Sequence, residues 1–119
     1  MVAATPPPDN HLSVGGRVIQ APERRYNPAG IPIARFRLEH YSVQEEGDRP
    51  REVRFRLQVI AAGEAIQAAV DRLEEGVEAR VSGFMSRAGY RQGDYRLVLH
   101  ARTIDIQAAP GNAGGPPEN

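Results

Sequence analysis

One stretch of the chain, residues 33–60, constrains the fold more than any other. It reads IARFRLEHYSVQEEGDRPREVRFRLQVI, and both of its halves alternate apolar with charged or polar side chains. Alternation with a period of two is typical of a strand with one buried and one solvent-facing side. Between the halves, QEEGDRPR contains a Gly and a Pro, which interrupt strands. We therefore expect a long β-hairpin whose outer face carries Arg35, Arg37, Arg54 and Arg56.

The segment before this hairpin predicts a first strand over residues 12–20, where apolar residues again alternate. Gly15 and Gly16 fall inside it, and glycines in a strand mark a bulge or a close approach of two backbones. Ala21-Pro22 and then residues 27–30 (NPAG) predict a bend that leads into the hairpin.

After the hairpin the period changes. Residues 63–73 place Ile66, Val70 and Leu73 at helical spacing and predict a short amphipathic helix. Residues 77–85 and 95–107 return to strand alternation. Three strands, a helix and two strands is the element order of the five-stranded OB barrel. We therefore predict an all-β fold of this type with one short helix between strands three and four. A mixed α+β sheet and an SH3-like barrel are the alternatives.

The chain has 119 residues, which suits one domain with a modest core. Residues 1–11 are rich in Pro and polar residues, and residues 108–119 (AAPGNAGGPPEN) in Gly, Pro and Asn. Such segments cannot bury enough apolar surface to become ordered. We therefore expect an OB-fold domain over residues 12–107, with a flexible tail on each side.

Composition excludes several function classes. There is no cysteine, hence no disulfide and no thiolate metal site. No apolar run is long enough for a membrane span, and the first residues lack the pattern of a signal peptide. These features favour a soluble, cytoplasmic protein. The formal net charge is zero, and all 15 basic residues are arginines, a preference that base composition of the genome can also produce.

Nothing in the sequence predicts an enzyme. The three histidines, His11, His40 and His100, are far apart and match no metal-ligand spacing. No Gly-rich phosphate loop leads from a strand into a helix. We expect no catalytic residue, metal or cofactor, and we expect His100 in or beside the core or at a subunit contact.

Nucleic-acid binding is better supported. An OB fold holds its ligand across strands two and three and between the loops that join strands one–two and four–five. Arginines and tyrosines collect at these places, whereas acidic residues collect near the helix. A solvated face paired with Glu39 and Glu52 is the alternative interpretation. The predicted nucleic-acid contacts are Arg25, Arg35, Arg37, Arg51, Arg54, Arg56, Arg87, Tyr90, Arg91 and Arg96.

Four strings carry a resemblance to a known family: GIPIARFRLEHYSVQEE (30–46), RVIQAP (17–22), VSGF (81–84) and LVLHA (97–101). Together they resemble the primosomal replication protein N, or PriB, family over residues 12–106. The resemblance implies an OB fold, a homodimer and single-stranded DNA binding at replication forks. It also implies two protein partners in replication restart, the PriA helicase and then DnaT.

The family's DNA-binding positions are only partly matched. Arg25, Arg51, Arg91 and Arg96 occupy its basic positions, and Gly89 replaces a third basic position in the loop between strands four and five. Arg49 and Arg54 stand where the family has stacking aromatics. Because stacking is worth about 1–3 kcal/mol per base, we expect weak binding of single-stranded DNA, mainly through phosphates.

Two other functions stay open. One is a stand-alone single-stranded DNA-binding protein of the SSB type, although its usual long tail with an acidic tip is not seen in AAPGNAGGPPEN. The other is a protein-interaction adaptor with little affinity for DNA. For a dimer, the first strand and the apolar residues Val98, Ile104 and Ile106, expected on the outside, would cover exposed sheet edges.

Overall fold

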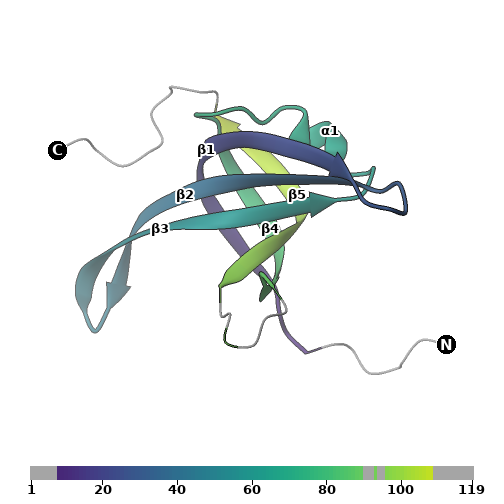
Figure 1. Cartoon of the computed structure of the whole chain (residues 1–119). Coiled ribbons are helices and arrows are strands. Elements are labelled where there is room, and N and C mark those ends of the chain that lie inside the picture. The colour runs from purple at the N-terminus through teal and green to yellow at the C-terminus, as the bar shows by residue number, and fades with distance from the viewer. Residues whose placement is uncertain (1–7, 90–92, 94–95, 109–119) are drawn as a thin grey trace.

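The computed structural model describes residues 8–89, 93 and 96–108. Within them, five strands close into a barrel in the order β1-β2-β3-β5-β4, and a short helix lies against the barrel (Figure 1). The barrel and its element order confirm the predicted OB-type fold, and the closure excludes an open mixed sheet. The elements are β1 Leu12–Tyr26, β2 Pro32–Glu46, β3 Arg49–Ala62, α1 Gln67–Val70, β4 Glu78–Arg87 and β5 Leu97–Ala108.

The core is made by the inward-facing residues of all five strands. Phe36 and Leu38 of β2, Val59 of β3 and Leu99 of β5 are fully buried, as the alternation of each strand predicts. Val98 and Ile104, which we expected on the outside, are also buried, and Ile104 belongs to the core. For Ile104, and for Ile106, which packs against the core, that expectation was wrong because it did not allow for the irregular register between β4 and β5. Val98 does face outward, beside Gln58 of β3, but it is covered by its neighbours.

The helix is shorter than the helical spacing predicted. α1 spans only Gln67–Val70. The chain continues as a tighter helical turn to Leu73, in which each amide donates to the carbonyl three residues back: Arg72 N to Ala69 O at 3.1 Å and Leu73 N to Val70 O at 3.0 Å. Val70 and Leu73 are nevertheless buried in the barrel core. The spacing thus identified the buried face correctly and overestimated the length of regular helix.

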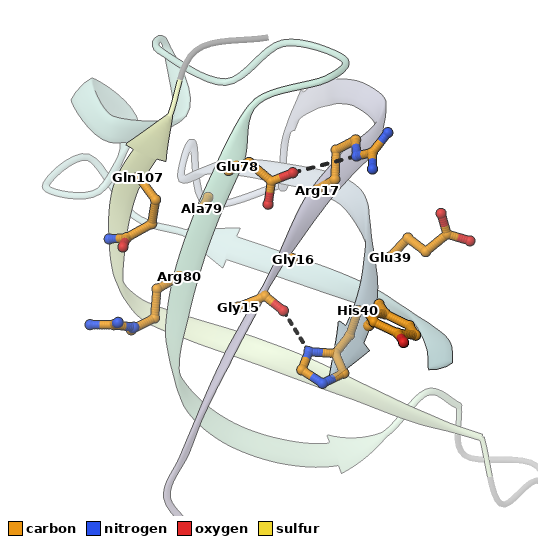
Figure 2. A pocket seen from close by; sticks show the side chains of 10 residues that line it. Gly15, Gly16, Arg17, Glu39, His40, Glu78, Ala79, Arg80 and Gln107 are labelled. Atoms are coloured by element: carbon orange, nitrogen blue, oxygen red, sulfur yellow. Dashed lines mark hydrogen bonds and ion pairs between the residues drawn. The ribbon is translucent and has the colours of Figure 1, made fainter. Parts of the chain in front are cut away.

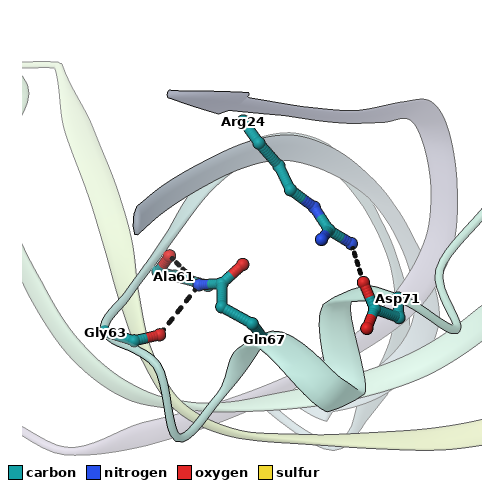
Figure 3. A network of polar contacts seen from close by, with 5 residues as sticks. All are labelled: Arg24, Ala61, Gly63, Gln67 and Asp71. Carbon is teal, nitrogen blue, oxygen red and sulfur yellow. Dashed lines mark hydrogen bonds and ion pairs between the residues drawn. The ribbon is translucent and has the colours of Figure 1, made fainter. Parts of the chain in front are cut away.

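Polar contacts hold this helical segment in place (Figure 3). The Gln67 side-chain Nε2 donates to the carbonyls of Gly63 (2.9 Å) and Ala61 (3.3 Å), at the end of β3. On the other side, Arg24 of β1 forms an ion pair with Asp71 at 2.5 Å. Both groups of that pair are exposed, so the pair orients α1 more than it stabilises the fold.

β1 belongs to two parts of the barrel. Residues 12–17 pair with β4, and residues 17–26 pair with β2, with two register shifts between Val18 and Glu23. The bend predicted at Ala21-Pro22 is therefore wrong: the strand passes through it as an irregularity, where a proline costs no ladder hydrogen bond. The bend at residues 27–30 is present. A Cβ on Gly16 would lie 2.6 Å from the Glu39 carbonyl oxygen, so Gly16 marks the expected close approach.

The predicted hairpin is longer than expected. β2 and β3 pair without interruption from Ile33–Ala62 to Glu46–Arg49. Only Gly47 and Asp48 turn, and both have positive φ (61° and 65°), as a two-residue type I′ turn requires. The far half of this hairpin extends beyond the barrel as an arm (Figure 1).

The predicted tails are only partly within the described residues, since 1–7 and 109–119 lie outside them. Asn10, in the first tail, exchanges two hydrogen bonds with the backbone of Met85, at 2.9 and 3.0 Å. Ala108, in the second, is the last residue of β5.

Gly83 provides a test of the barrel. A Cβ there would lie 1.8 Å from the His100 carbonyl oxygen, where the β4–β5 register shifts. We expect Gly83→Ala to lower the free energy of unfolding by about 3 kcal/mol, because backbone must move to admit the methyl group. The matched control is Gly15→Ala, whose Cβ would lie 4.0 Å from its nearest neighbour. Urea denaturation measures both, and equal stability of the two variants would contradict this description of the barrel.

Candidate nucleic-acid interface

The four hairpin arginines lie on one face. In the β2–β3 ladder, Arg35 is opposite Ile60, Arg37 opposite Gln58, Glu39 opposite Arg56, and Tyr41 opposite Arg54. Residues directly opposite in an antiparallel pair project to the same side, and so do residues two apart in a strand. Arg35, Arg37, Arg54 and Arg56 therefore share the outer face of the hairpin, and all four are exposed.

This outer face continues onto β1. Glu23 lies opposite Arg35, and Arg25 lies opposite Ile33. Arg25 thus reaches the same surface near the end of β1. A shallow hollow of about 170 Å³ between β1 and β3 is lined by Glu23, Arg35 and Arg37 among others. The carboxylate of Glu23 lowers the positive potential at this edge of the face.

On its other side, the face continues towards β5. β3 and β5 are parallel, with Gln58 beside Val98. A hollow of about 360 Å³ lies along this seam and is lined by Arg37, Arg56 and Arg96, together with Leu97 and Gln58. Three cations from β2, β3 and the start of β5 therefore converge on one groove.

The remaining predicted residues separate into two groups. Arg87 is the last residue of β4, and its Nε donates to the Gly89 carbonyl at 3.0 Å, so its side chain lies along the start of the loop between β4 and β5. Tyr90 and Arg91, from the same loop, lie outside the described residues.

Arg51 is on the opposite face of the arm. It lies opposite Gln44, out of phase with Arg54 and Arg56, and its Nη1 is 3.3 Å from Glu46 Oε1. The structure does not bring Arg51 together with the other predicted contacts. Arg49, opposite Glu46, shares that far face.

Few of the described arginines on the outer face form ion pairs. Arg56 Nε lies 3.4 Å from Glu39 Oε2, the one ion pair on this face among the described residues. Arg56 is exposed, and pairs of this kind contribute little. No ion pair of Arg35 or Arg37 occurs in the described part of the chain. Arg56 thus pairs with Glu39 as the solvated-face interpretation predicts. Glu23 and Glu52 share the outer face with the other arginines without forming an ion pair to them in the described residues.

A third hollow, of about 310 Å³, lies where β1 crosses from β2 to β4 (Figure 2). His40 fixes this corner: its Nδ1 donates to the Gly15 carbonyl at 2.6 Å, and its Nε2 lies 2.7 Å from Ser42 Oγ. Arg17 and Glu78 pair across the hollow at 3.4 Å. Its charges are of both signs and its histidine is committed to the backbone, so it does not resemble a phosphate site.

His100 lies on the outer side of β4 and β5, half-buried beside the core as one alternative predicted. Its ring stacks on Phe84, with centroids 4.9 Å apart, and its Nε2 is 2.7 Å from Ser86 Oγ. Burial lowers the pKa of His100 below its ordinary value of 6.5, since desolvation disfavours the charged ring. In the β3–β5 ladder His100 lies beside Ile60, which is itself opposite Arg35, so this histidine is on the same outer surface, two strands from the arginines.

No group of three or more His, Cys, Asp and Glu side chains in the described ranges could hold a metal ion. None of the helical segments described there is long and apolar enough to cross a membrane.

One residue of this face was missed by the sequence analysis. Tyr41 follows Arg35 and Arg37 in the same alternation, and Arg54 lies over its ring, with the guanidinium carbon 4.8 Å from the ring centroid. The parity of the strand could have placed Tyr41 here, but only the cross-strand register reveals its contact with Arg54.

Comparison with known proteins identifies the family of the chain. A family model described as "Another single-strand binding protein family" matches residues 10–103. The replication restart protein PriB of Photobacterium profundum is 40% identical over 97 residues, which are 82% of this chain and 93% of that protein. PriB of Vibrio vulnificus is 40% identical over 95 residues, 80% of this chain and 95% of its own length.

Solved structures show the same fold. PriB from Ralstonia solanacearum superposes with a TM-score of 0.70 at 24% identity, covering 84% of this chain and 99% of that one. An SSB from Plasmodium falciparum, solved in complex with ssDNA, gives a TM-score of 0.70 at 13% identity, covering 87% and 99%. From the family model and the 40% identical relatives together, the chain belongs to the single-strand binding proteins and, among them, to the replication restart protein PriB family.

Proposed function

We propose that this protein acts in replication restart by binding single-stranded DNA across the outer face of β1, β2 and β3. Membership of the PriB family supports the process, and the arginine face supports the ligand. The observation that carries the proposal is the groove between β3 and β5, where Arg37, Arg56 and Arg96 converge. A groove with several guanidiniums can follow a phosphate backbone without reading its sequence.

The binding is mainly electrostatic. Arg49 and Arg54 stand where the resemblance led us to expect aromatic rings, and Arg49 lies on the far face of the arm. Guanidiniums neutralise phosphates and release their counterions, so the association constant falls steeply as salt rises. We therefore expect modest affinity at physiological salt, with Arg25, Arg35, Arg54 and Arg87 adding contacts around the central groove.

Substitution of two groove arginines tests this surface. In Arg37→Gln/Arg56→Gln, two phosphate contacts are lost, so the slope of log K against log salt should become shallower by about 1.4, at about 0.7 per contact for single strands. Fluorescence anisotropy with a labelled oligothymidylate at several salt concentrations measures the slope. The control, Arg72→Gln/Arg80→Gln, removes the same charge from exposed residues away from this face.

The control should keep the wild-type slope. Tight wild-type binding that barely changes with salt would sink the electrostatic proposal, and so would equal slopes in the two double variants.

Contact with the PriA helicase, followed by DnaT, is the second part of the proposed function. The surface supports two kinds of contact, because acidic residues collect on and around α1 while arginines collect on the β2–β3 face. Arg24 neutralises only Asp71 of the helical segment. The acidic residues of that region are Glu64, Asp71, Glu74, Glu75 and Glu78.

A pull-down tests the proposed contact with PriA. Immobilised protein should retain PriA without DNA, because modest DNA affinity leaves protein contacts to hold the assembly together. Bovine serum albumin on the same resin controls for non-specific capture. DNA binding without retention of PriA would favour a stand-alone single-stranded DNA-binding protein. Retention of PriA without DNA binding would favour the adaptor, which the zero net charge supports.

We also propose a homodimer. Residues 12–15 of β1 pair only with β4 in the described part of the chain, so their other backbone edge is open apart from the contact of His40 with Gly15. Open edges pair readily with another strand. Sedimentation velocity at micromolar concentration should give twice the mass of the 13.0 kDa chain. A single species at the monomer mass would refute the dimer.

A further inference from the structure

The outer face of the hairpin contains one aromatic ring held by a cation. Tyr41 of β2 lies directly opposite Arg54 of β3, and the guanidinium carbon of Arg54 is 4.8 Å from the centre of the Tyr41 ring. Both side chains project to the same side as Arg37 and Arg56. Tyr41 is half-buried, whereas Arg54 is exposed.

From this pair we infer that Tyr41 stacks against a base of the bound single strand, with Arg54 as its partner. This inference rests on the proposed function and names a binding residue that the sequence analysis did not include. Cross-strand partners have Cβ atoms only about 4.5–5.5 Å apart. A ring on β2 therefore occupies nearly the same place on the sheet as a ring on β3 would.

The pair is suited to a base for two reasons. A guanidinium is planar and stacks on both rings and bases, so Arg54 extends the flat surface of Tyr41 and adds a charge for a phosphate. Stacking is tolerant of sequence because every base has a π-face.

The position also fits the groove. Tyr41 lies four residues from Arg37 along β2, about 13 Å at the usual rise of a strand. A strand whose phosphates lie on Arg37, Arg56 and Arg96 could therefore place a neighbouring base on Tyr41.

Another ring of the hairpin, Phe55, provides the alternative platform. Phe55 is 39% exposed and stacks on His40, with centroids 4.8 Å apart. Phe55 lies opposite His40 in the ladder, so it projects to the far side of the hairpin from Tyr41. His40 is bound to the Gly15 carbonyl at the barrel corner. Phe55 is thus an aromatic ring next to Arg54 in β3, but it lies on the face of the hairpin opposite to Tyr41 and the arginines.

Three variants separate the two rings. Tyr41→Leu should weaken binding of a labelled oligothymidylate by roughly 5- to 150-fold, the range expected for one stacked base. The slope of log K against log salt should stay that of the wild type, because the Tyr41 ring neutralises no phosphate and its loss leaves counterion release unchanged. Tyr41→Phe, which keeps the ring, should bind far more tightly than Tyr41→Leu. Phe55→Leu should bind as the wild type does.

A measurement on the unaltered protein covers the case in which Tyr41→Leu does not fold. Irradiation of a complex with an oligonucleotide containing 5-iodouracil joins that base to a ring stacked on it, and mass spectrometry of the digest locates the bond. We expect the bond at Tyr41. A bond at Phe55, or none at Tyr41, would overturn the inference.

The outcomes distinguish this inference from the proposed function. If the wild type binds DNA and Tyr41→Leu binds equally well, the stacking role is refuted and the arginine face stands. If Phe55→Leu loses affinity and Tyr41→Leu does not, the ligand lies on the far face of the hairpin. If the wild type binds no DNA, the proposed function fails and the role of Tyr41 fails with it.

Discussion

The uninterrupted ladder between β2 and β3 is the constraint on which the rest of the structure depends. One phase of its alternation sends Phe36, Leu38 and Val59 into the core, and the other sends the arginines to solvent. A slip of one residue would exchange the two sets, burying guanidiniums and exposing the core. The free energy that stabilises the barrel therefore also fixes the position of every charge on the binding face.

Closure of the barrel depends on close backbone contacts that only glycine permits. Gly16 lies against the Glu39 carbonyl where β1 leaves β2 for β4, and Gly83 lies against the His100 carbonyl where β4 meets β5. These contacts let β5 reach β3 and form the parallel pair that closes the barrel. The same closure brings Arg96 beside Arg37 and Arg56, so the groove is a product of the closed topology and not of the hairpin alone.

Local patterns predicted the element order, the buried face of the helical segment and the arginine face, because period and turn chemistry are visible in a single sequence. The passage of β1 through Ala21-Pro22 was not predictable, since a bulge in the pairing with β2 overrides a local bend signal. The burial of Ile104 likewise depends on a register shift between distant strands. Arg51 could have been separated from Arg54 by counting, because an odd spacing places two strand residues on opposite faces. The contact between Tyr41 and Arg54 needed the long-range register itself.

The central claim is that single-stranded DNA lies on the outer face of β1, β2 and β3. Titration of ¹⁵N-labelled protein with oligothymidylate, followed by NMR of backbone amide and Arg Nε resonances, tests it most directly. We predict that the largest shifts occur at Arg37, Tyr41, Arg54 and Arg56 and weaken as salt is added. Shifts centred on Phe84 and His100 of the β4–β5 surface, with the hairpin arginines unchanged, would contradict it.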